Sequence, residues 1–107
     1  MRSFERTDRL NEELRRILGE LLEREVRDPR IGRVTLTGVE MTRDLSVARV
    51  FVALPEGQDV PATMKGLQGA AGFLRRRLAE NWPLRNIPEL RFCYDESVER
   101  GIRMEAL

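Results

Sequence analysis

The chain has 107 residues, of which 41% are hydrophobic, so it fits a single domain over residues 1–107 with a core of its own. Nineteen basic and eighteen acidic residues leave a formal net charge of +1, which by itself does not indicate a nucleic-acid partner. The sequence has no apolar run near the ~20 residues of a membrane span, a highly charged N-terminus and one cysteine, Cys93, which together favour a cytoplasmic location without a membrane partner.

A first helix is predicted over residues 4–26. Its apolar residues recur every three or four positions and form one stripe: Leu10, Leu14, Ile17, Leu18, Leu21 and Leu22. The opposite face mixes glutamate and arginine, as solvated helix surfaces do. We expect the helix to end near RDPRIG (27–32), because Asp28 precedes Pro29 and residues before proline avoid helical dihedrals.

Two strands are predicted next, at residues 34–42 and 46–54, joined as an antiparallel hairpin. In the first strand Val34 and Leu36 share one face, but after Gly38 the apolar positions shift to Val39 and Met41. A glycine at such a change of phase predicts a β-bulge or a sharp bend.

A second helical pattern begins near Asp59 and ends at Asn81 and Pro83. It contains QGAAGFLRRRL (68–78), where glycines interrupt the pattern although each costs about 1 kcal/mol relative to alanine in a helix. We predict a helix break within residues 69–73, with a kink at Ala70, Ala71 and Gly72 that divides the pattern into two helices. The alternative is that the small residues only permit tight packing of the helix on the sheet.

The sequence IPELRFCYD (87–95) predicts a third strand, with Leu90, Phe92 and Tyr94 on one face. The expected fold is α+β, in the order helix, strand, strand, kinked helix pair, strand. Its three-stranded sheet should carry the helices on one face. Trp82, at the end of the second helical pattern, is expected to pack in the core rather than to stack on a base.

Arginine supplies 18 of the 19 basic residues, and its planar guanidinium suits phosphate recognition. If Leu74 and Leu78 point inward, Arg76 faces solvent and its neighbours flank it. The candidate RNA-binding residues are Arg75, Arg76, Arg77, Arg85 and Arg91, and a second candidate group at the start of the first helix is Arg2, Arg6 and Arg9. The alternative interpretation treats these arginines as an ordinary solvated surface.

The residues for catalysis and metal binding are scarce. The chain has no histidine, one cysteine and scattered carboxylates, and it has no phosphate-binding glycine loop followed by Lys-Ser/Thr. We therefore predict a protein that is not an enzyme and that uses no metal, cofactor or small-molecule substrate.

The element order resembles that of a type II KH domain, a fold that binds single-stranded nucleic acid through a GXXG loop between two helices. The segment 69–72 matches that loop in spacing but lacks the basic residue often found inside it. Nearly the whole chain is similar to the bacterial ribosome-binding factor A family. The resemblance is carried by Asp28-Pro29-Arg30-Ile31, Asp44-Leu45-Ser46, the kink with Leu74-Arg75, and residues 84–90 from Leu84-Arg85 to Pro88-Glu89-Leu90.

This resemblance implies a KH-like fold in which an Ala-x-Gly kink, here 70–72, replaces the loop. It implies a monomeric, non-enzymatic assembly factor that binds rRNA of the free or precursor small (30S) ribosomal subunit, assists rRNA maturation and leaves before translation. The alternative function is a protein-interaction domain of α+β type whose arginines confer solubility. Salt dependence separates the two, because phosphate contacts make binding fall steeply with salt.

Overall fold

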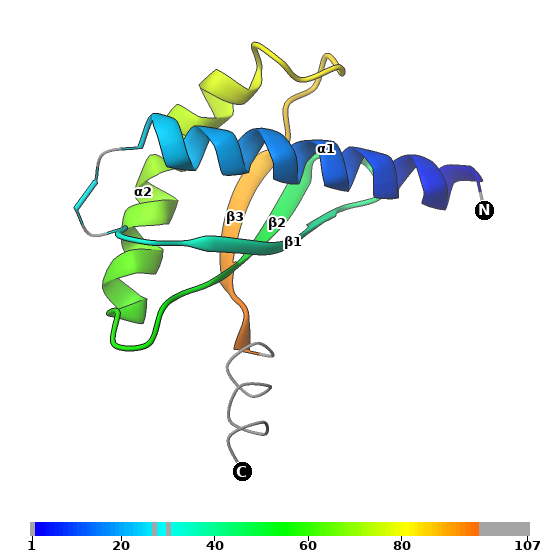
Figure 1. The fold of residues 1–107 in the computed structure, drawn as a ribbon. Helices are drawn as coiled ribbons and strands as arrows, with labels where there is room; N and C mark the ends of the chain where they lie inside the picture. Colours follow the sequence, from blue (N-terminus) through cyan, green and yellow to red (C-terminus); the bar gives the residue numbers. More distant parts are fainter. Residues whose placement is uncertain (1, 27, 30, 97–107) are drawn as a thin grey trace.

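The computed structural model describes residues 2–26, 28–29 and 31–96, with the side chains of residues 2–6 left undescribed. Its elements in chain order are α1 (Arg2–Arg24), β1 (Thr35–Met41), β2 (Val47–Ala53), α2 (Val60–Leu78) and β3 (Glu89–Tyr94). Figure 1 shows α1 lying along β1 and across β2 and β3, with α2 beside β3. The predicted α+β class and order of elements are confirmed, except for the kinked helix pair.

The sheet has the order β1-β2-β3, and it is mixed. β1 and β2 pair antiparallel, whereas β2 and β3 pair parallel because α2 connects them from one end of the sheet to the other. The predicted hairpin is therefore confirmed. The register shifts between Leu36 and Gly38, which leaves Thr37 as the extra residue of a bulge and confirms the irregularity predicted at this glycine.

α2 is one continuous helix, so the predicted break at residues 69–73 is wrong. Asp59 caps its N-terminus by accepting a hydrogen bond from the amide of Ala62 at 3.0 Å. Leu67 and Leu74 lie on either side of the expected break, and both are completely buried. Burying a leucine side chain contributes about 1.5–3 kcal/mol, more than the roughly 1 kcal/mol cost of a helical glycine. Tertiary packing therefore outweighs local propensity, and Ala70 and Ala71, both good helix formers, do not oppose it.

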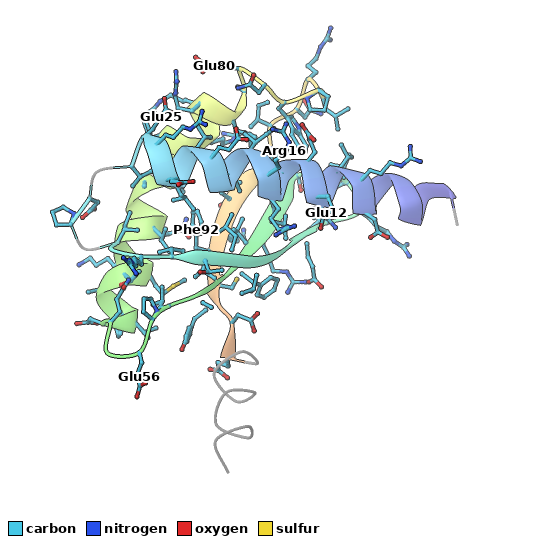
Figure 2. The ribbon with its side chains drawn as sticks, viewed as in Figure 1. Glu12, Arg16, Glu25, Glu56, Glu80 and Phe92 are labelled. Carbon is cyan, nitrogen blue, oxygen red and sulfur yellow. The ribbon has the colours of Figure 1, made fainter. Side chains whose placement is uncertain are left out.

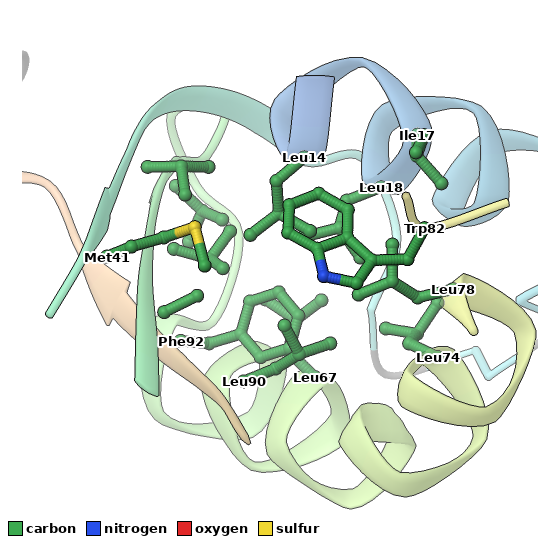
Figure 3. Close-up of a cluster of buried hydrophobic side chains, with 14 of the residues drawn as sticks. Leu14, Ile17, Leu18, Met41, Leu67, Leu74, Leu78, Trp82, Leu90 and Phe92 are labelled. Carbon is green, nitrogen blue, oxygen red and sulfur yellow. The ribbon is translucent and has the colours of Figure 1, made fainter. Parts of the chain in front are cut away.

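Both helices cover the same face of the sheet and share one core with it (Figure 3). α1 contributes Leu14, Ile17 and Leu18 to this core, as its stripe predicts. The sheet contributes alternate residues of each strand, and the helices α2 and α1 close over them. Trp82 is 7% exposed and packs in the core, so the expected packing role is confirmed. Within residues 2–96 as described, no helix covers the opposite face of the sheet, which carries Arg49 and Phe51.

Side chains from the helices bond to both outer edges of the sheet. At the β1 edge, Asn11 accepts a hydrogen bond from the amide of Met41 at 3.1 Å. At the β3 edge, Gln68 donates to the carbonyl of Leu90 and accepts from the amide of Phe92, each at 3.1 Å. These bonds satisfy edge groups that would otherwise invite another strand, and they fix α2 against β3.

Trp82 carries an unusual polar atom, which gives a first prediction. Its indole Nε1 is buried and has no hydrogen-bond partner in the described part of the chain. An unsatisfied buried donor destabilises the fold by about 1–3 kcal/mol. Removing it with the indole should therefore offset most of the packing energy that is lost when phenylalanine replaces the larger ring. Trp82→Phe is therefore expected to change the free energy of unfolding by less than about 1 kcal/mol, whereas Trp82→Ala should cost about 3–5 kcal/mol. Urea unfolding of both variants tests this, and a loss above 2 kcal/mol in Trp82→Phe would mean that the donor is satisfied by water.

Candidate functional site

The outward face of α2 carries an exposed row of four residues: Lys65, Gly69, Gly72 and Arg76. Their spacing of four, three and four places them on the same side of the helix. We call this row the α2 outer face. It is directed away from the core, because the buried leucines of α2 lie on the other side.

The two glycines of the α2 outer face are not required by the fold. A Cβ added at Gly69 would meet nothing within 4 Å, and one added at Gly72 would meet only Nη1 of Arg76 at 3.9 Å. Neither residue has a positive φ, since the only such glycines in the described chain are Gly32 and Gly57. Tight packing on the sheet, the alternative considered for these residues, therefore does not explain them. What the glycines do provide is a bare stretch of helix backbone between two cations.

Arg75 lies at the border of the α2 outer face and connects α2 to the segment before β3. Its guanidinium donates to the backbone carbonyl of Ile87 from Nη2 at 2.9 Å and from Nε at 3.3 Å. This bond ties α2 to the connection that leads into β3. Arg85 belongs to the same connection and is exposed. Arg75 thus holds the segment that carries Arg85.

Arg77 is occupied by carboxylates. It binds both oxygens of Glu25, with Nη2–Oε1 at 2.5 Å and Nε–Oε2 at 2.8 Å, and it lies 2.9 Å from a carboxylate oxygen of Glu80. Figure 2 shows Glu25 at the end of α1, near the end of α2 where Glu80 lies. The hydrogen bonds from Arg77 lower the pKa of Glu25, and those to Glu25 raise the pKa of Arg77. This bidentate pair joins the two helices, so Arg77 has a structural role among the predicted RNA-binding arginines.

The Glu25–Arg77 pair predicts an acid dependence of stability. Because the pKa of Glu25 is lower in the folded chain than its ordinary value of 4.5, the pair stabilises the fold above that value and stops doing so as the pH falls through the lowered pKa. Glu25→Gln should therefore lower the melting temperature at pH 7 and have a much smaller effect near pH 2. Glu56→Gln, in the exposed β2–α2 connection, is the matched control and should keep the wild-type acid dependence. An equal effect of Glu25→Gln at both pH values would contradict the assignment.

The remaining predicted arginines do not join the α2 outer face. Arg91 lies on the sheet face opposite the helices, 3.5 Å from Glu89. Arg9 is exposed on α1, in the half of the helix that lies far from α2 (Figure 1). The side chains of the other two arginines of that group, Arg2 and Arg6, are outside the described part of the structure.

Three cations therefore remain available: Lys65 and Arg76 on the α2 outer face, and Arg85 on the connection between α2 and β3. All three are exposed, and within the described residues none takes part in an ion pair. Between residues 60 and 92 the chain has six basic residues and two acidic ones, and both acidic residues are already paired with arginines. This arrangement suits the binding of phosphate groups. Lys65 was not among the predicted residues, although its spacing from Gly69, Gly72 and Arg76 was visible in the sequence.

Other kinds of site find less support in the described residues. These residues contain no cluster of three or more cysteine or carboxylate side chains arranged to hold a metal ion. Neither of the two helices in this part of the chain combines the length and apolar character needed to cross a membrane.

Comparison with known proteins places the chain among ribosome-binding factors. A family model described as Ribosome-binding factor A matches residues 6–107. Ribosome-binding factor A of Thioalkalivibrio sulfidiphilus is 49% identical, with 99% of this chain and 83% of that protein covered, and the protein of Nitrosomonas europaea is 48% identical, with 99% and 92% covered. The crystal structure of ribosome-binding factor A from Thermus thermophilus superimposes with a TM-score of 0.76 at 27% identity, covering 82% of this chain and 93% of that one. A homology model of the Thermus thermophilus protein, fitted into a cryo-EM map of a 30S complex, gives a TM-score of 0.68 at 27% identity with the same coverage.

Proposed function

This chain belongs to the ribosome-binding factor A family, and we propose that it is an assembly factor that binds the free small (30S) ribosomal subunit or its precursor. The binding is to rRNA, it assists rRNA maturation, and it ends before translation. The proposal is supported by the relative that was fitted into a 30S complex and by nearly full-length similarity to proteins named ribosome-binding factor A.

The observation that carries the RNA part of the proposal is the α2 outer face. Lys65 and Arg76 on this face, and Arg85 on the connection that follows α2, present positive charge that no described carboxylate neutralises. Gly69 and Gly72 leave the helix backbone open between Lys65 and Arg76. A phosphate backbone can approach such a surface closely and exchange its counterions for the fixed cations. In a KH-like domain this helix lies beside the site that holds single-stranded nucleic acid, so the location fits the proposed fold relationship.

We propose further that the protein acts by binding alone, and that it is a cytoplasmic monomer without a cofactor. The rival function is a protein-interaction domain whose arginines only keep it soluble. The paired arginines fit that rival, since Arg77 and Arg91 are bound to glutamates. The unpaired cations of the α2 outer face favour the RNA-binding function, because a purely solvated surface gains nothing from two glycines that weaken its helix.

Sedimentation of a cell extract tests the proposed function. At 0.1 M salt the protein is expected to migrate with free small subunits and their precursors, and to be absent from whole ribosomes and polysomes. Rebinding of the purified protein to salt-washed small subunits should weaken steeply as salt rises. Equal distribution over all ribosomal fractions, or binding that does not depend on salt, would be incompatible with the proposal.

A further inference from the structure

We propose that the hollow beside Phe73 receives one unpaired base of the bound RNA, with the Phe73 ring as its stacking surface; this inference rests on the proposed function. Among the described residues Phe73 is the exposed large hydrophobic side chain, with 39% of its surface accessible. It lies next to Gly72 in the chain and one helical turn before Arg76. An aromatic ring therefore borders the very surface that we propose to hold the phosphates.

The ring faces a shallow, wide-open hollow of about 460 Å³ between α2 and the segment that follows α1. Ala70 and Phe73 line it from α2, and Val26 and Pro29 line it from the other side. These four side chains are apolar, so the hollow offers a flat planar group a surface from which water is easily displaced. The carboxylates of Glu25 and Asp28 complete its lining.

The wall opposite Phe73 is held in place by the fold. Ile31 is 5% exposed, and its amide donates to the carbonyl of Asp28 at 3.0 Å, which closes a turn around Pro29. The side-chain amide of Gln58 donates to the carbonyl of Ile31 at 2.6 Å. Arg77 fixes Glu25 from the other side. A wall built in advance spares a ligand the cost of ordering it.

The distribution of charge favours a base in the hollow and its phosphate outside it. The described lining offers no cation to a phosphate, since Glu25 is bound through both oxygens by Arg77 and the side chains nearest Phe73 are apolar. The cations Lys65 and Arg76 lie on the adjoining outer face, where they attract the phosphates. Only an unpaired base can be turned out of its strand to reach an aromatic side chain in this way. The ligand of the site is therefore a single-stranded nucleotide rather than a duplex.

The test uses the full chain and purified free small subunits. Phe73→Leu keeps an apolar side chain but removes the ring, and Phe73→Trp keeps a stacking surface. We expect Phe73→Leu to weaken binding about 5- to 100-fold, as loss of one stacked base does, with an unchanged salt slope. Phe73→Trp should bind like the wild type. Phe51→Leu makes the same exchange on the opposite sheet face and should have no effect.

Chemical modification of unpaired bases provides the second measurement. At saturating protein, the wild type and Phe73→Trp should protect one unpaired rRNA base that Phe73→Leu leaves reactive. Unchanged affinity in a folded Phe73→Leu protein overturns the inference. Weaker binding without any change in base reactivity also overturns the inference, since the hollow beside Phe73 would then contact a ribosomal protein and not a base. Arg76→Gln, measured alongside, should reduce the salt slope, and a wild-type protein that does not bind free small subunits at all would contradict the proposed function itself.

Discussion

Replacing Lys65, Arg76 and Arg85 together by glutamine is expected to weaken binding to free small subunits about 100-fold at 0.1 M salt. Each phosphate contact makes the logarithm of the binding constant fall by about 0.7–0.9 for each tenfold rise in salt. Losing three contacts should therefore make the salt slope shallower by about 2, and it should lower the binding constant at 0.1 M salt by about two orders of magnitude. The fold should survive, because all three side chains are exposed and unpaired in the described chain, and such substitutions usually cost under about 0.5 kcal/mol each.

The control removes three exposed arginines elsewhere, Arg33, Arg43 and Arg49, of which Arg49 pairs with Glu40 at 3.3 Å. It changes the net charge by the same amount, so a general electrostatic effect would weaken both variants equally. Co-sedimentation at several salt concentrations, with thermal unfolding of each protein, separates the two. Equal behaviour of the two triple variants would move the RNA-binding surface away from α2, most simply to Arg9 and its neighbours at the start of α1.

The double substitution of Gly69 and Gly72 by alanine is expected to make the protein more stable and a poorer binder. Alanine is favoured over glycine in a helix by roughly 1 kcal/mol, and neither new Cβ meets a close neighbour, so the free energy of unfolding should rise by about 1–2 kcal/mol. That gain corresponds to an increase in melting temperature of at least about 4 °C for a domain of this size. Binding should weaken at least about tenfold, because the new methyl groups hold the phosphate backbone away from the helix.

Ala62→Gly, near the start of the same helix, is a useful comparison because it changes helix propensity in the opposite direction. It should lower stability by about 1 kcal/mol and leave the affinity of the folded protein unchanged. Thermal unfolding and subunit binding of both variants give the result. Greater stability with unchanged binding in the double alanine variant would show that the partner does not approach the backbone at these glycines.

The fold was largely predictable because periodicity reports burial directly. The α1 stripe, the hairpin and the bulge near Gly38 each leave a pattern of apolar positions that depends only on which face meets the core. The helix break was predicted wrongly because the sequence shows only the local free-energy cost of glycine in a helix. It does not show that Leu67 and Leu74 are buried against the rest of the core, which stabilises the continuous helix.

The candidate site was predictable only in part, since the sequence locates charges but not their partners. Arg76 and Arg85 were identified and remain unpaired in the described chain. Arg77 could not be separated from them, because its partner Glu25 lies 52 residues away in the sequence. The hollow beside Phe73 was also hidden, since its two sides come from α2 and from the segment after α1.

Directed hydroxyl-radical cleavage tests most directly whether the α2 outer face lies against rRNA. An iron chelate is attached to a single cysteine in a Cys93→Ser background, either at Ala79→Cys, exposed at the end of α2, or at Arg49→Cys, on the opposite face of the sheet. With the protein bound to free small subunits, we expect strong, localised cleavage of the rRNA from position 79 and little from position 49. Strong cleavage from position 49 with none from position 79 would contradict the account, because the sheet face and not α2 would then face the RNA.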